Sequence, residues 1–141
     1  MKRLALVLLL TTCAGLLMPG CEKKPAIAPV QGTVKINGVV AGGIDVQFYP
    51  DHKKDTRGPR SSGVTDENGA FTLKTDTGEE GAVVGFHRVV LDDTRRRVAQ
   101  QGEMPSPDDS RIPEHYTQLA YTPVLIEVKP GQPIVIEVTR P

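Results

Sequence analysis

The chain of 141 residues is long enough for one compact domain, and its 17 Lys and Arg residues balance 17 Asp and Glu residues. This balance argues against a nucleic-acid-binding protein, which needs a concentrated basic face. The only two cysteines, Cys13 and Cys21, lie near the N-terminus, so the rest of the sequence has neither a disulfide nor a cysteine metal site.

The N-terminal segment has the order of a secretory signal peptide. Two basic residues are followed by an apolar stretch, Leu4–Leu17, and then by Gly20 and Cys21. The stretch is shorter than the roughly 20 apolar residues that a transmembrane helix needs. We therefore predict that residues 1–20 are a signal peptide and that the protein is exported.

Gly20 directly before Cys21 resembles the lipobox of bacterial lipoproteins, in which the cysteine receives acyl chains such as palmitate and becomes the first residue. Cys13 is the competing site, but the apolar run before it is short and Thr12 is a poor cleavage residue. Each buried methylene contributes about 0.8 kcal/mol to membrane binding, so several acyl chains anchor a protein stably. We expect lipidation at Cys21, and Glu22 after it favours the outer membrane over the inner one.

A short tether precedes the first two strands. Residues 21–29 are charged and then punctuated by proline, a composition that stays extended. Apolar and polar residues alternate over Val30–Ile36 and again over Ile44–Pro50, which predicts two strands with one buried face each. Between them, Asn37 and Gly38 are the residue types of a tight turn.

Five further strands are predicted. They span Ser61–Thr65, Phe71–Lys74, Gly85–Leu91, Val124–Lys129 and Ile134–Val138. The turn residues at 66–69 and 130–131 predict a hairpin at each place, and Gly85–Leu91, apolar on both faces, predicts an interior strand. The sequence contains no Trp, so its core must consist of Val, Ile and Leu, and the branched residues among them favour strands. Together with the seven predicted strands, this composition indicates that residues 30–141 form an all-β, seven-stranded Greek-key β-sandwich.

The long connection at residues 92–122 is the candidate binding loop. Arg95, Arg96 and Arg97 form its dense basic cluster. The cluster is either a solvated loop tip, neutralised by neighbouring aspartates, or a site where guanidinium groups hold an anionic partner.

The second half of this loop carries His115 and Tyr116, which we expect to anchor it. Pro113 before them can occupy the first position of a helical turn. Successive turns of a sandwich alternate between its two ends, so this loop should lie beside residues 38–43 and 66–69. That end is the predicted binding surface.

Several segments together resemble a known family. They are Val30–Val34, Ile44–Pro50, Ser62–Phe71, Gly85–Val89 and Ile112–Tyr116. In order and spacing they resemble the transthyretin-like, carboxypeptidase-regulatory-type lipoproteins of planctomycete bacteria, over essentially the whole chain. The resemblance implies a prealbumin-like sandwich that is exported and lipid-anchored, and it brings no catalytic residues.

No sequence pattern predicts a catalytic or metal site. His52, His87 and His115 are far apart, residues 66–69 lack the ligand pattern of a calcium loop, and no Gly-x-Ser-x-Gly elbow is present. His87 is expected to be a partly buried strand residue. We therefore expect no cofactor and no metal.

The leading functional hypothesis is a non-enzymatic, lipid-anchored envelope protein that is structural or binds a protein or polysaccharide through its loops. One alternative is an accessory domain that tethers an exported enzyme. A second is a transthyretin-related hydrolase, but those enzymes end in Tyr-Arg-Gly-Ser, whereas this chain ends in Thr139, Arg140 and Pro141.

Overall fold

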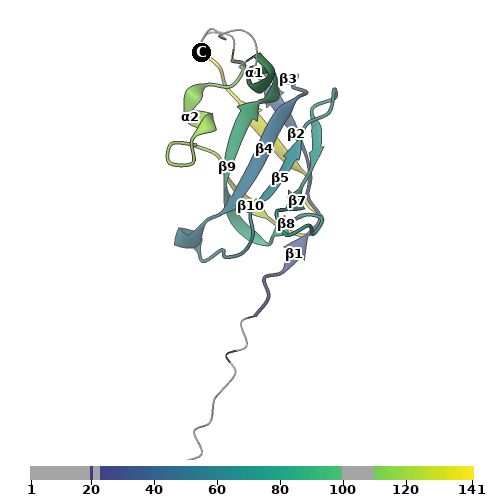
Figure 1. The fold of residues 1–141 in the computed structure, drawn as a ribbon, viewed down its shortest axis with the longest axis vertical. Helices are drawn as coiled ribbons and strands as arrows, with labels where there is room; N and C mark the ends of the chain where they lie inside the picture. The colour runs from purple at the N-terminus through teal and green to yellow at the C-terminus, as the bar shows by residue number, and fades with distance from the viewer. Residues whose placement is uncertain (1–19, 21–22, 100–109) are drawn as a thin grey trace, which may run out of the picture.

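A computed structural model describes residues 20, 23–99 and 110–141, with residues 97–99 described only in their backbone. Strands dominate this part of the chain, and its helical elements are short: η1 (His52–Lys54), α1 (Thr94–Ala99) and α2 (Glu114–Thr117). The strands form open sheets in a sandwich-like arrangement (Figure 1). The predicted all-β architecture is confirmed.

The larger sheet has five antiparallel strands in the order β10, β9, β4, β5 and β7. In that order the strands span Leu125–Val128, Gly85–Asp93, Ile44–Pro50, Ser61–Val64 and Lys74–Thr75. The strand β9 lies between β10 and β4. It is therefore an interior strand, as its two apolar faces predicted.

The second sheet is built around β2 (Gln31–Ile36). One side of β2 pairs in parallel with β11 (Ile134–Val138), and the other side pairs antiparallel with β3 (Val39–Val40) and β6 (Ala70–Thr72). Figure 1 shows β2 and β11 behind the larger sheet. The chain thus places two layers of strands face to face.

The core between the layers consists mainly of aliphatic side chains. Ile44, Val46 and Phe48 of β4 are completely buried, and so are Val89 and Leu91 of β9. These residues alternate along their strands with less buried ones, because successive side chains of a strand point to opposite faces. Each such burial stabilises the fold by about 1.5–3 kcal/mol.

His87 faces the same core and is fully buried, not partly buried as predicted. Its ring lies against that of Phe48, with 5.7 Å between centroids, and its Nδ1 lies 3.1 Å from the carbonyl oxygen of Gly85. Its Nε2 has no hydrogen-bond partner among the described residues. Burial lowers the pKa of His87, although the Gly85 contact opposes this, so the structure favours the neutral imidazole.

The hairpin predicted at residues 130–131 is wrong, and the one predicted at residues 66–69 holds only in part. After the first turn β6 pairs with β2, and the chain then returns to β5 through β7, where Ser62 is the partner of Lys74. After the second turn β11 pairs with β2 and not with β10. The turns form, with Gly69 and Gly131 at positive φ, but each one carries the chain from one sheet to the other. The described residues contain eleven strand segments, several of which are only two or three residues long.

The sheet structure begins before Val30, the predicted start of the domain. Ile27–Ala28 forms β1, which pairs with β8 (Ala82–Val83), and the side chain of Ala28 is buried. The carbonyl of Ala26 also accepts a hydrogen bond from the N–H of Val84. The second half of the expected tether is therefore part of the fold.

The helix α2 covers the part of β9 that lies beyond the start of β10. The strand β10 pairs only with Gly85–Arg88, and ahead of it in the chain the hydroxyl of Thr122 donates a hydrogen bond to the carbonyl of Val89. Ile112 and Tyr116 then enter the core from this segment. A helical turn was predicted here, but Pro113 precedes the helix as its cap instead of occupying its first position.

Candidate binding site

The predicted site residues that are described lie around the C-terminal end of β9. Arg95 and Arg96 follow it directly in α1, and His115 and Tyr116 lie in α2, which packs against β9. The side chain of Arg97 and the predicted lipidation site, Cys21, lie outside the described residues. The structure therefore brings the two halves of the candidate loop to one strand end.

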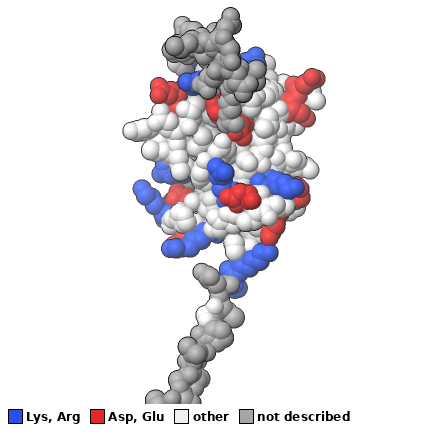
Figure 2. Space-filling view, viewed as in Figure 1, with Lys and Arg blue, Asp and Glu red and all other residues white. Residues whose placement is uncertain are grey.

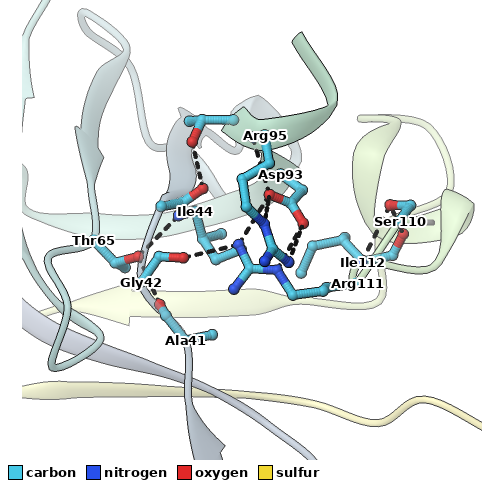
Figure 3. A network of polar contacts seen from close by, with 11 residues as sticks. Ala41, Gly42, Ile44, Thr65, Asp93, Arg95, Ser110, Arg111 and Ile112 are labelled. Atoms are coloured by element: carbon cyan, nitrogen blue, oxygen red, sulfur yellow. Dashed lines mark hydrogen bonds and ion pairs between the residues drawn. The ribbon is translucent and has the colours of Figure 1, made fainter. Parts of the chain in front are cut away.

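A buried ion pair holds these segments together (Figure 3). Asp93, the last residue of β9, is only 2% exposed, and both of its oxygens accept hydrogen bonds from Arg111. The distances are 2.7 Å to Nε and 2.9 Å to a terminal nitrogen, which is the bidentate geometry that guanidinium and carboxylate groups favour. We call Asp93 and Arg111 the loop clamp.

The loop clamp also reaches the turn before β4. Arg111 donates a 2.8 Å hydrogen bond to the carbonyl of Gly42, and the hydroxyl of Thr94 donates one of 2.7 Å to Gly43. Thr65, just before the turn at residues 66–69, accepts a hydrogen bond from the N–H of Ile44. The prediction that these three connections lie together is thus confirmed for the residues described.

The electrostatics of the clamp favour a charged carboxylate in spite of burial. Burial by itself would raise the pKa of Asp93, but hydrogen bonds from Arg111 and then Arg95 lower it to about 2. Arg95 contributes a backbone N–H at 3.1 Å and longer side-chain contacts. Arg95 therefore takes part in holding the loop.

The second half of the candidate loop is anchored by one of its two predicted residues. Tyr116 is buried in the core, whereas His115 is exposed and lies over the tyrosine ring with centroids 4.4 Å apart. Tyr116 thus fixes α2 to the sandwich, and His115 covers it from the solvent side.

Beside the clamp, a pocket of about 500 Å³ lies on the outer face of the larger sheet. Its lining consists of Gln47, Tyr49, Val90, Asp92, Arg96, Thr117 and Leu119. Gln47 and Val90 are direct partners in the pairing of β4 with β9, so they form the floor. Arg96 from α1, Thr117 at the end of α2 and Leu119 after it provide the walls.

The outward side chains of β4 hold one another in place. The side-chain amide of Gln47 donates a 2.9 Å hydrogen bond to Asp45 and accepts one of 2.7 Å from the hydroxyl of Tyr49. The same hydroxyl accepts a 3.3 Å hydrogen bond from Arg60. Asp45, the first residue of this series, is only 8% exposed. We call these four residues the polar ladder, and it presents two of the pocket's side chains in fixed positions.

The arginine cluster does not act as one unit in the described residues. Arg95 is directed to Asp93, whereas Arg96 lines the pocket. Figure 2 shows acidic and basic side chains interspersed over this face of the molecule, without a broad region of one sign in view.

No protein-family model, curated protein or solved structure matches the chain. Within residues 23–99 and 110–141, no helix is long and apolar enough to cross a membrane. The same described residues contain no group of three or more His, Cys, Asp or Glu side chains placed to hold a metal ion.

Sequence reasoning found Arg95, Arg96 and Tyr116 but missed most of the other residues that build this site. The alternation of β4 placed Asp45, Gln47 and Tyr49 on its outer face, which was the available signal for the polar ladder. No local pattern marked Arg111 as the partner of Asp93, because the two residues meet only when the long loop folds back.

Proposed function

We propose that the protein is an exported, lipid-anchored and non-enzymatic envelope protein that binds a partner in the pocket beside the loop clamp. Signal cleavage after Gly20 and lipidation of Cys21 would join it to a membrane, with the outer membrane favoured. The partner would be an envelope protein or a polysaccharide. We further propose that the sandwich has the seven-stranded, Greek-key arrangement of prealbumin-like proteins and belongs to the lipoprotein family that the sequence resembles.

One observation carries this proposal: the chain enters the fold at the end opposite to the candidate loop. In Figure 1 the chain reaches the sandwich at β1, while α1 and the C-terminus lie at the far end. The segment between Cys21 and Ile27 spans at most about 20 Å when extended. An anchor at Cys21 would therefore hold the β1 end near the membrane and turn the pocket towards the surroundings.

The construction of the pocket supports binding over catalysis. Rigid strands and the polar ladder fix its floor, while the clamp and Tyr116 fix its walls. The described side chains that line it include no cysteine, serine or histidine, and Asp92 is their only carboxylate. Such preorganisation reduces the entropy lost when a ligand binds.

The anchor is tested by expressing the full chain in a bacterial host and measuring the intact mass of the membrane-extracted product. We expect the mass of residues 21–141 plus acyl chains, and an unlipidated product from the Cys21→Ser variant. A soluble wild-type product without acyl chains would refute the anchor.

The binding role is tested separately by photo-crosslinking in cells that naturally make the protein. A photoreactive residue replaces Leu119 at the pocket wall or, as control, Val39, which is exposed on β3. We expect discrete adducts from position 119 and not from position 39. Equal labelling at both positions, or none at 119, would refute the pocket as the binding site.

A further inference from the structure

The side chains around the pocket are those that recognise hydroxyl groups. Asp92 offers a carboxylate acceptor, Arg96 offers guanidinium donors, and Gln47 and Thr117 each offer both functions. A sugar ring presents hydroxyls that donate and accept in alternation, so it can satisfy such a mixed set.

The pocket also contains the apolar surface that a sugar ring requires. Leu119, 41% exposed, stands at the wall and supplies most of this surface, because Val90 on the floor is only 7% exposed. The carbon-bound hydrogens of a pyranose ring form an apolar face that can pack on such side chains. The volume of about 500 Å³ lies within the range of about 300–1,000 Å³ that is typical of small-molecule sites.

The charges at the pocket argue for a neutral ligand. Asp92 and Arg96 both line it, and Asp45, the direct partner of Asp92 in the pairing of β4 with β9, lies behind them. Directly opposite residues on one sheet face have their Cβ atoms about 5 Å apart, so two carboxylates lie on this side of the pocket. Two guanidinium groups balance them, because Arg96 lines the pocket and Arg60 reaches the hydroxyl of Tyr49. The site therefore has no excess charge that would attract an ionic ligand, which favours a neutral one.

The floor of the pocket disfavours a peptide ligand. Peptides commonly bind to a sheet by adding a strand to an open edge. At the pocket, Gln47 of β4 has β5 on one side and β9 on the other. The strand β9 pairs there only with β4, because β10 reaches no further than Arg88, and α2 packs against β9. The floor therefore presents mainly side chains.

From these observations we propose that the pocket binds a neutral saccharide, an inference that rests on the proposed binding function and specifies its ligand. The polar ladder holds Gln47 and Tyr49 towards the sugar hydroxyls, and Asp92 and Arg96 complete the contacts. Leu119, with the small exposed part of Val90, faces the apolar side of the ring.

The test is isothermal titration calorimetry of the full lipidated chain with three neutral linear trisaccharides, built of glucose, mannose or N-acetylglucosamine, and with trigalacturonate as an acidic probe. The detergent must have a polyoxyethylene headgroup, because a maltoside headgroup would compete for the pocket. Gln47→Ala and Asp92→Asn remove pocket contacts. Gln118→Ala is the matched control, because Gln118 is an exposed glutamine after α2 that does not line the pocket.

We expect at least one neutral trisaccharide to bind with a submillimolar dissociation constant. The affinity should fall at least tenfold in Gln47→Ala and Asp92→Asn and stay unchanged in Gln118→Ala. Tyr49→Phe, which keeps the ring but removes a rung of the ladder, serves as a milder second variant. Thermal unfolding of each variant shows whether the fold is retained.

Three results would overturn the inference. Binding of trigalacturonate alone, lost in Arg96→Ala, would show an acidic ligand and leave the proposed binding function standing. Binding of a neutral trisaccharide that the pocket variants do not weaken would place the sugar elsewhere. Absence of all binding, with adducts still formed at position 119, would show that the pocket binds another kind of partner.

Discussion

Replacing Arg111 with alanine is expected to destabilise the protein by about 2–3 kcal/mol. The change removes the two shortest hydrogen bonds to Asp93 and leaves a carboxylate that is 2% exposed. Removing one partner of a buried pair costs about 3–5 kcal/mol. Arg95 remains near Asp93, at 3.1 Å through its backbone N–H, and should reduce that cost.

The pKa of Asp93 leads to a similar magnitude. A fall from 3.8 to about 2 corresponds to about 2 kcal/mol of stabilisation at neutral pH. Because the folded-state pKa is the lower one, this contribution is complete above pH 5 and is lost as the pH falls towards 2. Wild-type stability should therefore decline over that range, and Asp93→Asn should remove this part of the decline.

The assay is denaturant unfolding followed by far-ultraviolet circular dichroism, repeated between pH 7 and pH 2. Arg95→Ala is the matched control, because its side chain is 63% exposed and its loss should cost less than about 1 kcal/mol. Thermal unfolding at neutral pH, measured in addition, should show a melting temperature about 10 °C lower in Arg111→Ala than in the wild type. If Arg111→Ala cost no more than Arg95→Ala, the clamp would not be what holds the loop.

Three further predictions concern the core. His87→Leu should leave the stability nearly unchanged at pH 7 and raise it at pH 5. The reason is that the pKa of His87 is lowered in the folded protein, so unfolding of the wild type takes up a proton below about pH 6.5. Equal acid sensitivity of the variant and the wild type in urea unfolding would contradict this. Gly63→Ala should lower the free energy of unfolding by more than about 1 kcal/mol, because the added Cβ would lie 2.0 Å from the carbonyl oxygen of Thr72. Ser62→Ala, at the exposed neighbouring residue, should change it little in the same assay. Tyr116→Ala should cost about 3 kcal/mol, and hydrogen exchange should show α2 opening more readily, whereas an unchanged exchange rate would refute the anchoring role.

Short-range patterns were sufficient for most of the strands. Val34, Ile44, Val46 and Phe48 are buried as the alternation of β2 and β4 predicted, and the turn at residues 37–38 joins β2 to β3. These features depend on the pleat of a strand and on the φ angles of a turn, which neighbouring residues determine.

Strand pairing was beyond the same patterns. Residues 66–69 and 130–131 have the composition of hairpin turns and do turn the chain, yet each leads to the opposite sheet. Phe71 after the first turn packs over Gly32, where a Cβ would lie 2.4 Å from the phenylalanine ring. This fit between two strands far apart in sequence decides the partner, and a turn motif contains no information about it.

The sequence by itself determined the all-β class, the main strands and the meeting of the three connections at one end. The tertiary structure alone decided the loop clamp, the polar ladder and the pocket. Asp93 and Arg111 are separated by the long loop, and their attraction becomes strong only when the fold removes the carboxylate from water. Such a pair leaves no periodic trace along the chain, so only the three-dimensional structure reveals it.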